Sequence, residues 1–260
     1  MQRSEYLRIV LAAGLLGAGC ATPPSSLAGP KPVDDVVITP SQALAPSEAR
    51  DTELDADWAS EGELRFEARV SSLATGPPLS WSSEALESLS AGLNDPGTRA
   101  TRAAVLLALD PRDTTSEILL QSLEARHVAP ARGLDAGDIL AAAALGQRAL
   151  DGDTIARLLA LVNGTRPHPD LEVRVECAAT LLGAGMAEEG VAAFLLRVLR
   201  AETPAQASDP IDWERVETMS WSKSRAAAAL AAHLRLPNDF HPDSPWQEQI
   251  DIAARWEAAL

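Results

Sequence analysis

The sequence predicts an all-α fold, an α-solenoid of stacked helical hairpins, and three observations support this prediction. Hydrophobic residues make up 46% of the 260 residues and aromatic residues only 4%, so the apolar content is mostly Ala and Leu, which favour helices. Val, Ile, Tyr and Phe are too sparse for a large sheet. The chain also repeats itself with a fixed period, which is typical of repeat architectures.

The repeat is carried by four similar Ala-rich segments, which begin at Arg102, Asp138, Arg174 and Arg225. The first three starts are 36 residues apart, and the last follows after 51 residues, one period plus an insertion of 15. A second set of apolar residues keeps the 36-residue spacing: Leu119, Ile155 and Val191, each followed four residues later by Leu123, Leu159 and Leu195. Spacing of i and i+4 places each pair on one helical face.

Turn and capping residues separate the two sets: Asp110-Pro111, Asp151-Gly152-Asp153 and Gly183-Ala184-Gly185. Each repeat is therefore predicted to be two helices joined by a short turn. A single hairpin would leave an apolar face uncovered, so its stability is expected to come from stacking on its neighbours.

The first 19 residues read as a secretory signal. Arg3 and Arg8 give a positive start, and residues 9–18 form an apolar run that is too short to span a bilayer. Small residues then lead into Cys20, and this ending resembles a bacterial lipobox. It departs from the usual pattern because Gly17, not leucine, stands three residues before the cysteine.

Cysteine usage agrees with this resemblance. The chain has only Cys20 and Cys177, and Cys177 falls in a helical apolar pattern that predicts a core position. The lipobox resemblance implies removal of residues 1–19 and acylation of Cys20, which would anchor the protein to a membrane. Ala21 after the cysteine favours the outer membrane under the known sorting rule. The alternatives are an ordinary cleaved signal peptide and an uncleaved apolar segment.

Residues 20–57 are rich in Pro, Ala and Ser, and acidic residues accumulate towards the end of the segment. Apolar residues show no regular spacing there, so this segment is predicted to be a disordered tether between the lipid and a folded body at 58–260. Residues 58–93 are predicted to form a degenerate first hairpin. The alternation of Leu64, Phe66, Ala68 and Val70 could instead be a short strand.

The repeated segments resemble HEAT repeats of the short bacterial kind, whose first helix has Asp, then Val-Arg, then Ala-rich positions before Leu-Gly. The best match is formed by Asp170, Val173, Arg174, Ala178, Ala179 and Gly183. The resemblance covers about residues 80–235, and it implies a fold without implying a function. Some HEAT-like proteins are bilin lyases or isomerases, but these work in the cytoplasm and this chain begins with an export signal.

An insertion at 203–217 interrupts the period with a polar segment that is predicted to be a loop containing Trp213, and Trp221 follows at the predicted start of the next helix. Insertions of this kind often lie on a binding face, and tryptophan is enriched at interaction hot spots. Trp213 and Trp221 are therefore candidate partner-binding residues. They could instead fold back to cover the end of the array. Residues 245–260 are predicted to be a closing helix.

The sequence contains no motif that supports catalysis or cofactor binding. The four histidines, His127, His168, His233 and His241, have no metal-ligand spacing and are predicted to be structural or solvated. No GxSxG elbow, P-loop or GxGxxG occurs. The formal charge of −15 argues against nucleic-acid binding.

The sequence therefore predicts a non-catalytic, membrane-anchored scaffold or adaptor of the bacterial cell envelope, which binds a protein or peptide partner and needs no cofactor or metal. Alternatives are a structural component of an envelope assembly and, less favoured, a bilin lyase-type enzyme.

Overall fold

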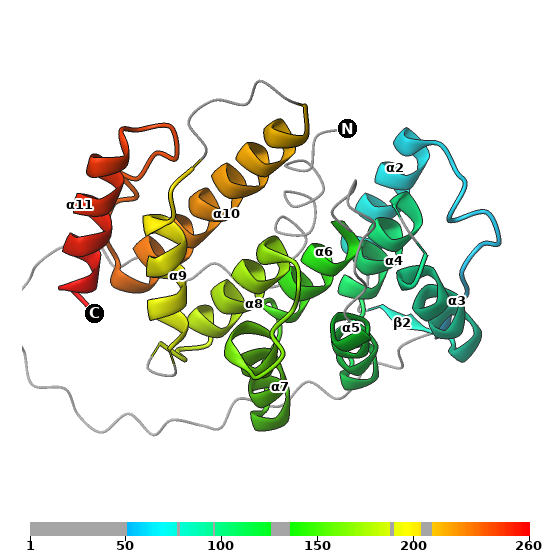
Figure 1. Ribbon diagram of the computed structural model, residues 1–260. Helices are drawn as coiled ribbons and strands as arrows, with labels where there is room; N and C mark the ends of the chain where they lie inside the picture. Colours follow the sequence, from blue (N-terminus) through cyan, green and yellow to red (C-terminus); the bar gives the residue numbers. More distant parts are fainter. Residues whose placement is uncertain (1–50, 77–78, 96, 126–135, 188–189, 204–209) are drawn as a thin grey trace, which may run out of the picture.

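The chain is all-α in the part that the structure, a computed structural model, describes: residues 51–76, 79–95, 97–125, 136–187, 190–203 and 210–260 (Figure 1). Ten helices occur in these ranges: α2 (Glu63–Ala74), α3 (Ser83–Leu93), α4 (Thr98–Ala108), α5 (Asp113–Ala125), α6 (Ala136–Leu145), α7 (Gly152–Asn163), α8 (Leu171–Gly183), α9 (Val191–Arg200), α10 (Pro210–Leu234) and α11 (Trp246–Glu257). The strands described are β1 (Asp51–Thr52) and β2 (Ser80–Trp81), which pair in parallel.

The helices pack in two layers. In the first layer, called layer A, α4 packs on α6, α6 on α8 and α8 on α10. In the second, called layer B, α3, α5, α7, α9 and α11 follow one another in the same way. Layer B helices α3, α5, α7 and α9 each also pack against the layer A helix that follows in sequence, and Figure 1 shows this progression from α3 to α11. Packing between successive helical pairs therefore joins the two layers into one core.

Layer A helices approach closely because their facing positions carry small residues. The buried alanines occur in pairs on each helix: Ala103 and Ala104, Ala141 and Ala142, Ala178 and Ala179, Ala226 and Ala227. Between α6 and α8, the Thr180 hydroxyl donates a hydrogen bond to the Ala142 carbonyl over 3.0 Å. A Cβ on Gly146 would lie 2.6 Å from that hydroxyl oxygen, so glycine is required where α6 ends.

Leucines fill layer B largely as the 36-residue spacing predicts. Leu119 and Leu123 of α5 are fully buried, and so are Val191 and Leu195 of α9. In α7, however, Ile155 and Leu159 are only half-buried. Both pack against the core, and the fully buried residues of α7 are Leu158, Leu161 and Val162.

Residues 58–93 form α2 and α3, and the alternative of a strand around Leu64–Val70 is wrong. Phe66 and Val70 are buried four residues apart on α2, which is helical and not strand spacing. The Arg102 guanidinium of α4 lies 4.9 Å from the centre of the Phe66 ring, which links α2 to the array.

The predicted tether ends earlier than residue 57. Asp51 and Thr52 pair with β2, and the Thr52 carbonyl accepts a hydrogen bond from the Ser82 N–H over 3.1 Å. Asp55 forms an ion pair with Arg69 of α2 at 2.6 Å. Residues 51–57 thus belong to the folded body, because acidic side chains that read as solvated in sequence have a partner on α2. Residues 1–50, with the predicted signal and Cys20, lie outside the described residues.

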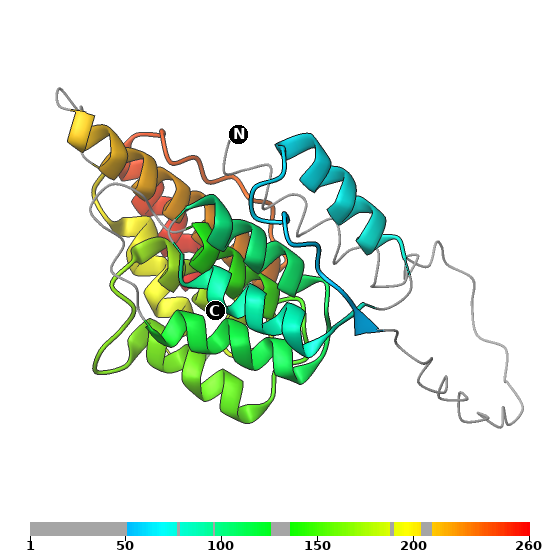
Figure 2. The same ribbon diagram turned by 90° about the vertical axis from the view of Figure 1, so that its right-hand side faces the viewer.

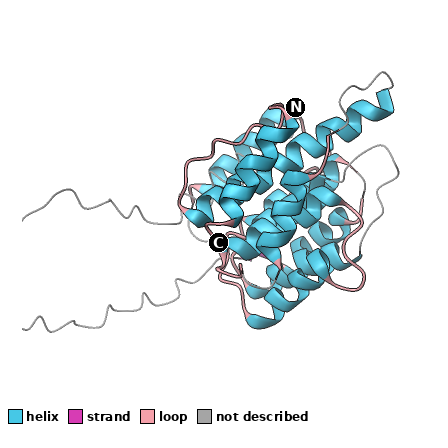
Figure 3. Cartoon of the chain, turned by 60° about the vertical axis from the view of Figure 1, so that its left-hand side comes forward, coloured by secondary structure: helices cyan, strands magenta, loops and turns pink. Residues whose placement is uncertain are grey.

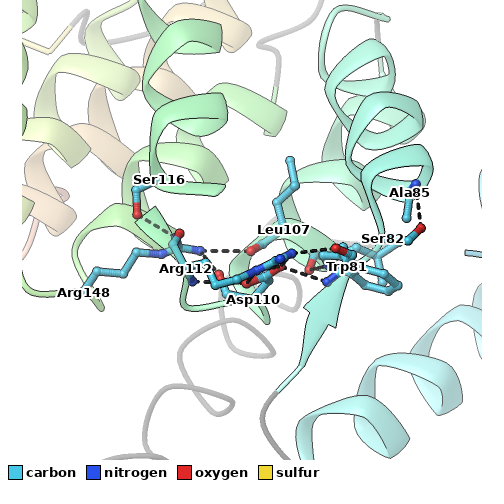
Figure 4. Close-up of polar contacts among 9 residues, drawn as sticks. Trp81, Ser82, Ala85, Leu107, Asp110, Arg112, Ser116 and Arg148 are labelled. Atoms are coloured by element: carbon cyan, nitrogen blue, oxygen red, sulfur yellow. Dashed lines mark hydrogen bonds and ion pairs between the residues drawn. The ribbon is translucent and has the colours of Figure 1, made fainter. Parts of the chain in front are cut away.

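A buried polar network fixes the N-terminal end of the array (Figure 4). The Asp110 carboxylate, at the end of α4, accepts hydrogen bonds from the Trp81 N–H over 3.0 Å and from Arg112 Nε over 2.9 Å. Arg148, after α6, donates to the carbonyls of Leu107 over 2.9 Å and of Asp110 over 2.8 Å. The buried residue Asp110 thereby joins β2, the end of α4 and the start of α5.

Candidate functional site

Both candidate tryptophans lie on α10, so the predicted loop at 203–217 is wrong for residues 210–217; residues 204–209 lie outside the described part. The helix begins at Pro210, so Trp213 lies in its first turn and Trp221 in its middle. Eight residues along an α-helix correspond to a rise of about 12 Å, which separates the two backbone positions along the helix axis. Trp221 is half-buried and packs against the core, as expected of a covering residue. The Trp213 side chain lies outside the part that the structure describes.

α10 consists of two parts with different surroundings. From Ser222 onward one face is buried, with Ala226, Ala227 and Leu230 fully inaccessible. From Arg215 to Trp221 every side chain is exposed or half-exposed. We call residues 210–221 the α10 projection, because this part of the helix extends past the other helices in Figures 2 and 3. The side chains of residues 215–221 are therefore accessible to solvent.

Two polar contacts hold the base of the α10 projection. Lys223 is wholly buried, and its Nζ donates to the Gln249 Oε1 of α11 over 2.7 Å. The Gln249 Nε2 in turn donates to the carbonyls of Pro242 and Ser244. Burial lowers the pKa of Lys223, since a cation loses its hydration there.

The second contact is an ion pair between α10 and α8. Arg225 Nε and Nη2 each donate to one carboxylate oxygen of Glu176 over 2.6 Å, and Glu176 is only 2% exposed. A two-pronged arginine–carboxylate pair fixes direction as well as distance. The base of the α10 projection is therefore held by side chains of α8 and α11.

Buried polar residues also gather where α6 meets the start of α8. His168, predicted to be structural or solvated, is buried, and its Nδ1 accepts a hydrogen bond from the Asp170 N–H over 3.1 Å. Its Nε2 lies 3.8 Å from Asp138 Oδ2, which is too long for a hydrogen bond. Because Nδ1 is an acceptor, the ring is the neutral tautomer with its proton on Nε2. His168 therefore supports the α7–α8 turn.

Cys177 lies in the core beside this cluster, as predicted. It is fully buried, and burial raises the pKa of its thiol far above the ordinary value, with smaller contributions from Glu176 and Asp138. A thiol in this state is a poor nucleophile, because the thiolate is the reactive form. In the described ranges, no group of three or more His, Cys, Asp and Glu side chains is placed to hold a metal ion.

The remaining predicted histidines do not form a site in the described part of the chain. His233 and His241 are both exposed, and the nearby Asp239 is paired with Arg255 at 2.7 Å. His127 lies outside the described residues. The solvated role predicted for His233 and His241 agrees with their exposure.

A surface hollow of about 430 Å³ lies between α5 and α7. Its carboxylates are Asp113, Glu117, Asp151 and Asp153. Arg157 forms ion pairs with two of them, Glu117 at 2.7 Å and Asp153 at 3.4 Å. It also pairs with Glu124. Asp151 accepts a hydrogen bond from the Thr154 N–H and caps α7. These contacts join α5 to α7 and cap α7, so Glu117, Asp151 and Asp153 have structural roles.

Comparisons with protein-family models, with curated proteins and with solved structures found no match for this chain. Among the described residues, no helix is both long and apolar enough to cross a bilayer. The feature that stands out from the regular packing is the α10 projection, whose base is held by Lys223 and Arg225 and whose residues 215–221 are exposed or half-exposed.

Proposed function

We propose that this chain is an exported lipoprotein, anchored through Cys20, whose body is an α-solenoid of HEAT-like hairpins that acts as a non-catalytic adaptor in the cell envelope. The two sequential layers and the 36-residue period support the solenoid. The apolar run before Cys20 supports export and lipidation. Residues 20–50 would then hold the body away from the membrane, with the outer membrane favoured.

The observation that carries the adaptor role is the α10 projection. It breaks the regular repeat, extends past the array and carries Trp213 in its first turn. Its base is locked by Lys223 and Arg225, so a partner would meet a rigid helix and would not have to order a loop. Tryptophan is among the residues enriched at the hot spots of protein interfaces.

One capture experiment with two readouts tests the proposal. Cells expressing the wild type, Cys20→Ala or Trp213→Ala are fed a fatty-acid analogue, fractionated, cross-linked and captured through a C-terminal tag. We expect the wild type and Trp213→Ala to carry the label and to sediment with membranes. Cys20→Ala should carry no label and should leave the membrane fraction, because its anchor is missing.

The second readout concerns the partner. Trp213→Ala is expected to reduce the yield of at least one cross-linked partner by about tenfold or more, as for a hot-spot residue. Trp246→Ala is the matched control, since Trp246 is a half-exposed tryptophan on α11, away from the α10 projection. Equal recovery from Trp213→Ala and wild type would contradict the adaptor role of this helix. A general loss of envelope integrity on deletion, with no specific partner, would favour a structural role.

A further inference from the structure

Two arginines share one aromatic ring where α8 and α9 meet. The Arg174 guanidinium lies 4.7 Å from the centre of the Phe194 ring, and the Arg197 guanidinium lies 5.9 Å from it. Arg174 is in the first turns of α8, and Arg197 follows Phe194 by one turn on α9. Phe194 itself is buried, so its ring is a fixed platform that attracts both cations.

These two guanidinium groups have no carboxylate within ion-pair distance among the described residues, in a chain with 37 acidic residues. Several arginines do have acidic partners: Arg157 contacts three carboxylates, and Arg200 pairs with Glu257 at 2.6 Å. The pKa of Arg174 is lowered, first by burial and then by the positive charge of Arg197. The local charge at this point is opposite to that of the whole molecule.

The N–H groups of Arg174 and Arg197 are only partly engaged in hydrogen bonds within the described part of the molecule. Arg174 Nε and Nη2 both donate to the Val162 carbonyl at the end of α7, over 3.2 and 2.9 Å, which holds the guanidinium in place. No hydrogen bond from Arg174 Nη1 or from Arg197 is formed within the described part of the molecule. Arg197 is exposed and Arg174 half-buried, so an acceptor can approach from solvent.

We propose that Arg174 and Arg197 form a docking surface for an acidic segment of a partner protein. Charge complementarity supports this occupant, because guanidinium groups bind carboxylates through paired, charge-assisted hydrogen bonds. A long polyanion such as nucleic acid, or an anionic membrane, would meet a surface with a net charge of −15 around this small basic patch. A short acidic peptide matches the patch and avoids most of that repulsion.

The surface is formed by residues of α8 and α9, not by the α10 projection, so this inference goes beyond the proposed adaptor role of Trp213 and is tested independently of it. The probe is a fluorescein-labelled hexaglutamate peptide, titrated with the full-length chain in an uncharged detergent and followed by fluorescence anisotropy. We expect Arg197→Gln to weaken binding by about tenfold or more, because a charge-assisted hydrogen bond is lost. Arg174→Gln should weaken it as well, with circular dichroism showing that the helices remain.

Arg65→Gln is the matched control, since Arg65 is an exposed arginine on α2 and the substitution changes the net charge equally. It should alter the affinity by less than about twofold, because salt screens distant surface charges. Failure of the wild type to bind hexaglutamate would overturn the proposal, and so would equal weakening by Arg65→Gln and Arg197→Gln. Tighter binding of oligothymidylate or of phosphatidylglycerol vesicles than of hexaglutamate would overturn the assignment of the partner.

Discussion

Replacing Arg225 by methionine is expected to lower the free energy of unfolding by about 3–5 kcal/mol, because it leaves Glu176 as an unpaired buried carboxylate. Glu176 is 2% exposed, and both of its carboxylate oxygens accept from Arg225 over 2.6 Å. The substitution keeps most of the apolar volume of the arginine stem. Urea unfolding followed by circular dichroism measures the change.

Two further variants make this test specific. Arg255→Met removes an exposed pair with Asp239 and should cost less than about 1 kcal/mol. The double variant Glu176→Leu/Arg225→Met should recover much of the loss, because no charge is left buried. If Arg225→Met costs no more than Arg255→Met, the ion pair does not hold α10 on α8.

Asp110→Asn is expected to destabilise the protein by about 2–3 kcal/mol at neutral pH. Asp110 is fully buried, and its carboxylate accepts from the Trp81 N–H and from Arg112. Burial alone would raise the pKa of Asp110, but these hydrogen bonds outweigh it and lower the pKa below 3.8. The carboxylate therefore stabilises the folded state more than a neutral group can.

The difference in unfolding free energy between the wild type and Asp110→Asn is expected to depend on pH. As the pH falls, the unfolded chain protonates Asp110 at about 3.8, before the folded chain does, so the stabilisation is lost as the pH falls through the lower folded pKa. The difference between wild type and Asp110→Asn should be constant from about pH 5 to 8 and shrink below about 3.8. A difference that stays the same in acid would contradict the assigned role of the charge.

Local patterns in the sequence predict the helices well. The i, i+4 leucines and the Ala-rich segments identify α4 to α9, because burial of one helical face leaves a direct periodic signal. Asp151 and Asp170 cap their helices as turn residues of this kind should, each accepting backbone N–H groups of the first turn. The depth of burial along α7, where Leu158 is fully buried and Ile155 only partly, depends on how neighbouring helices pack.

Pairing across the chain could not be predicted in the same way. In sequence Asp55 belongs to an acidic segment that predicts a tether, and its ion pair with Arg69 appears only in the fold. Residues 210–217 are polar and predict a loop, although they form the start of α10. The sequence contained one unused signal, because Lys223 is one of only two lysines and lies in an Ala-rich helical segment. Its burial against Gln249 and the proximity of Arg174 to Arg197 depend on tertiary packing alone.

Hydrogen exchange of the full-length chain tests the central claim most directly, namely that successive helical pairs stabilise one another by stacking. Helices with packed neighbours on both sides should open least often, whereas end helices should fray first. We therefore expect the amides of α6 and α8 to exchange slowest, and those of α2 and α11 to exchange much faster. Protection in α2 or α11 equal to that in α6 and α8 would contradict this account of the fold.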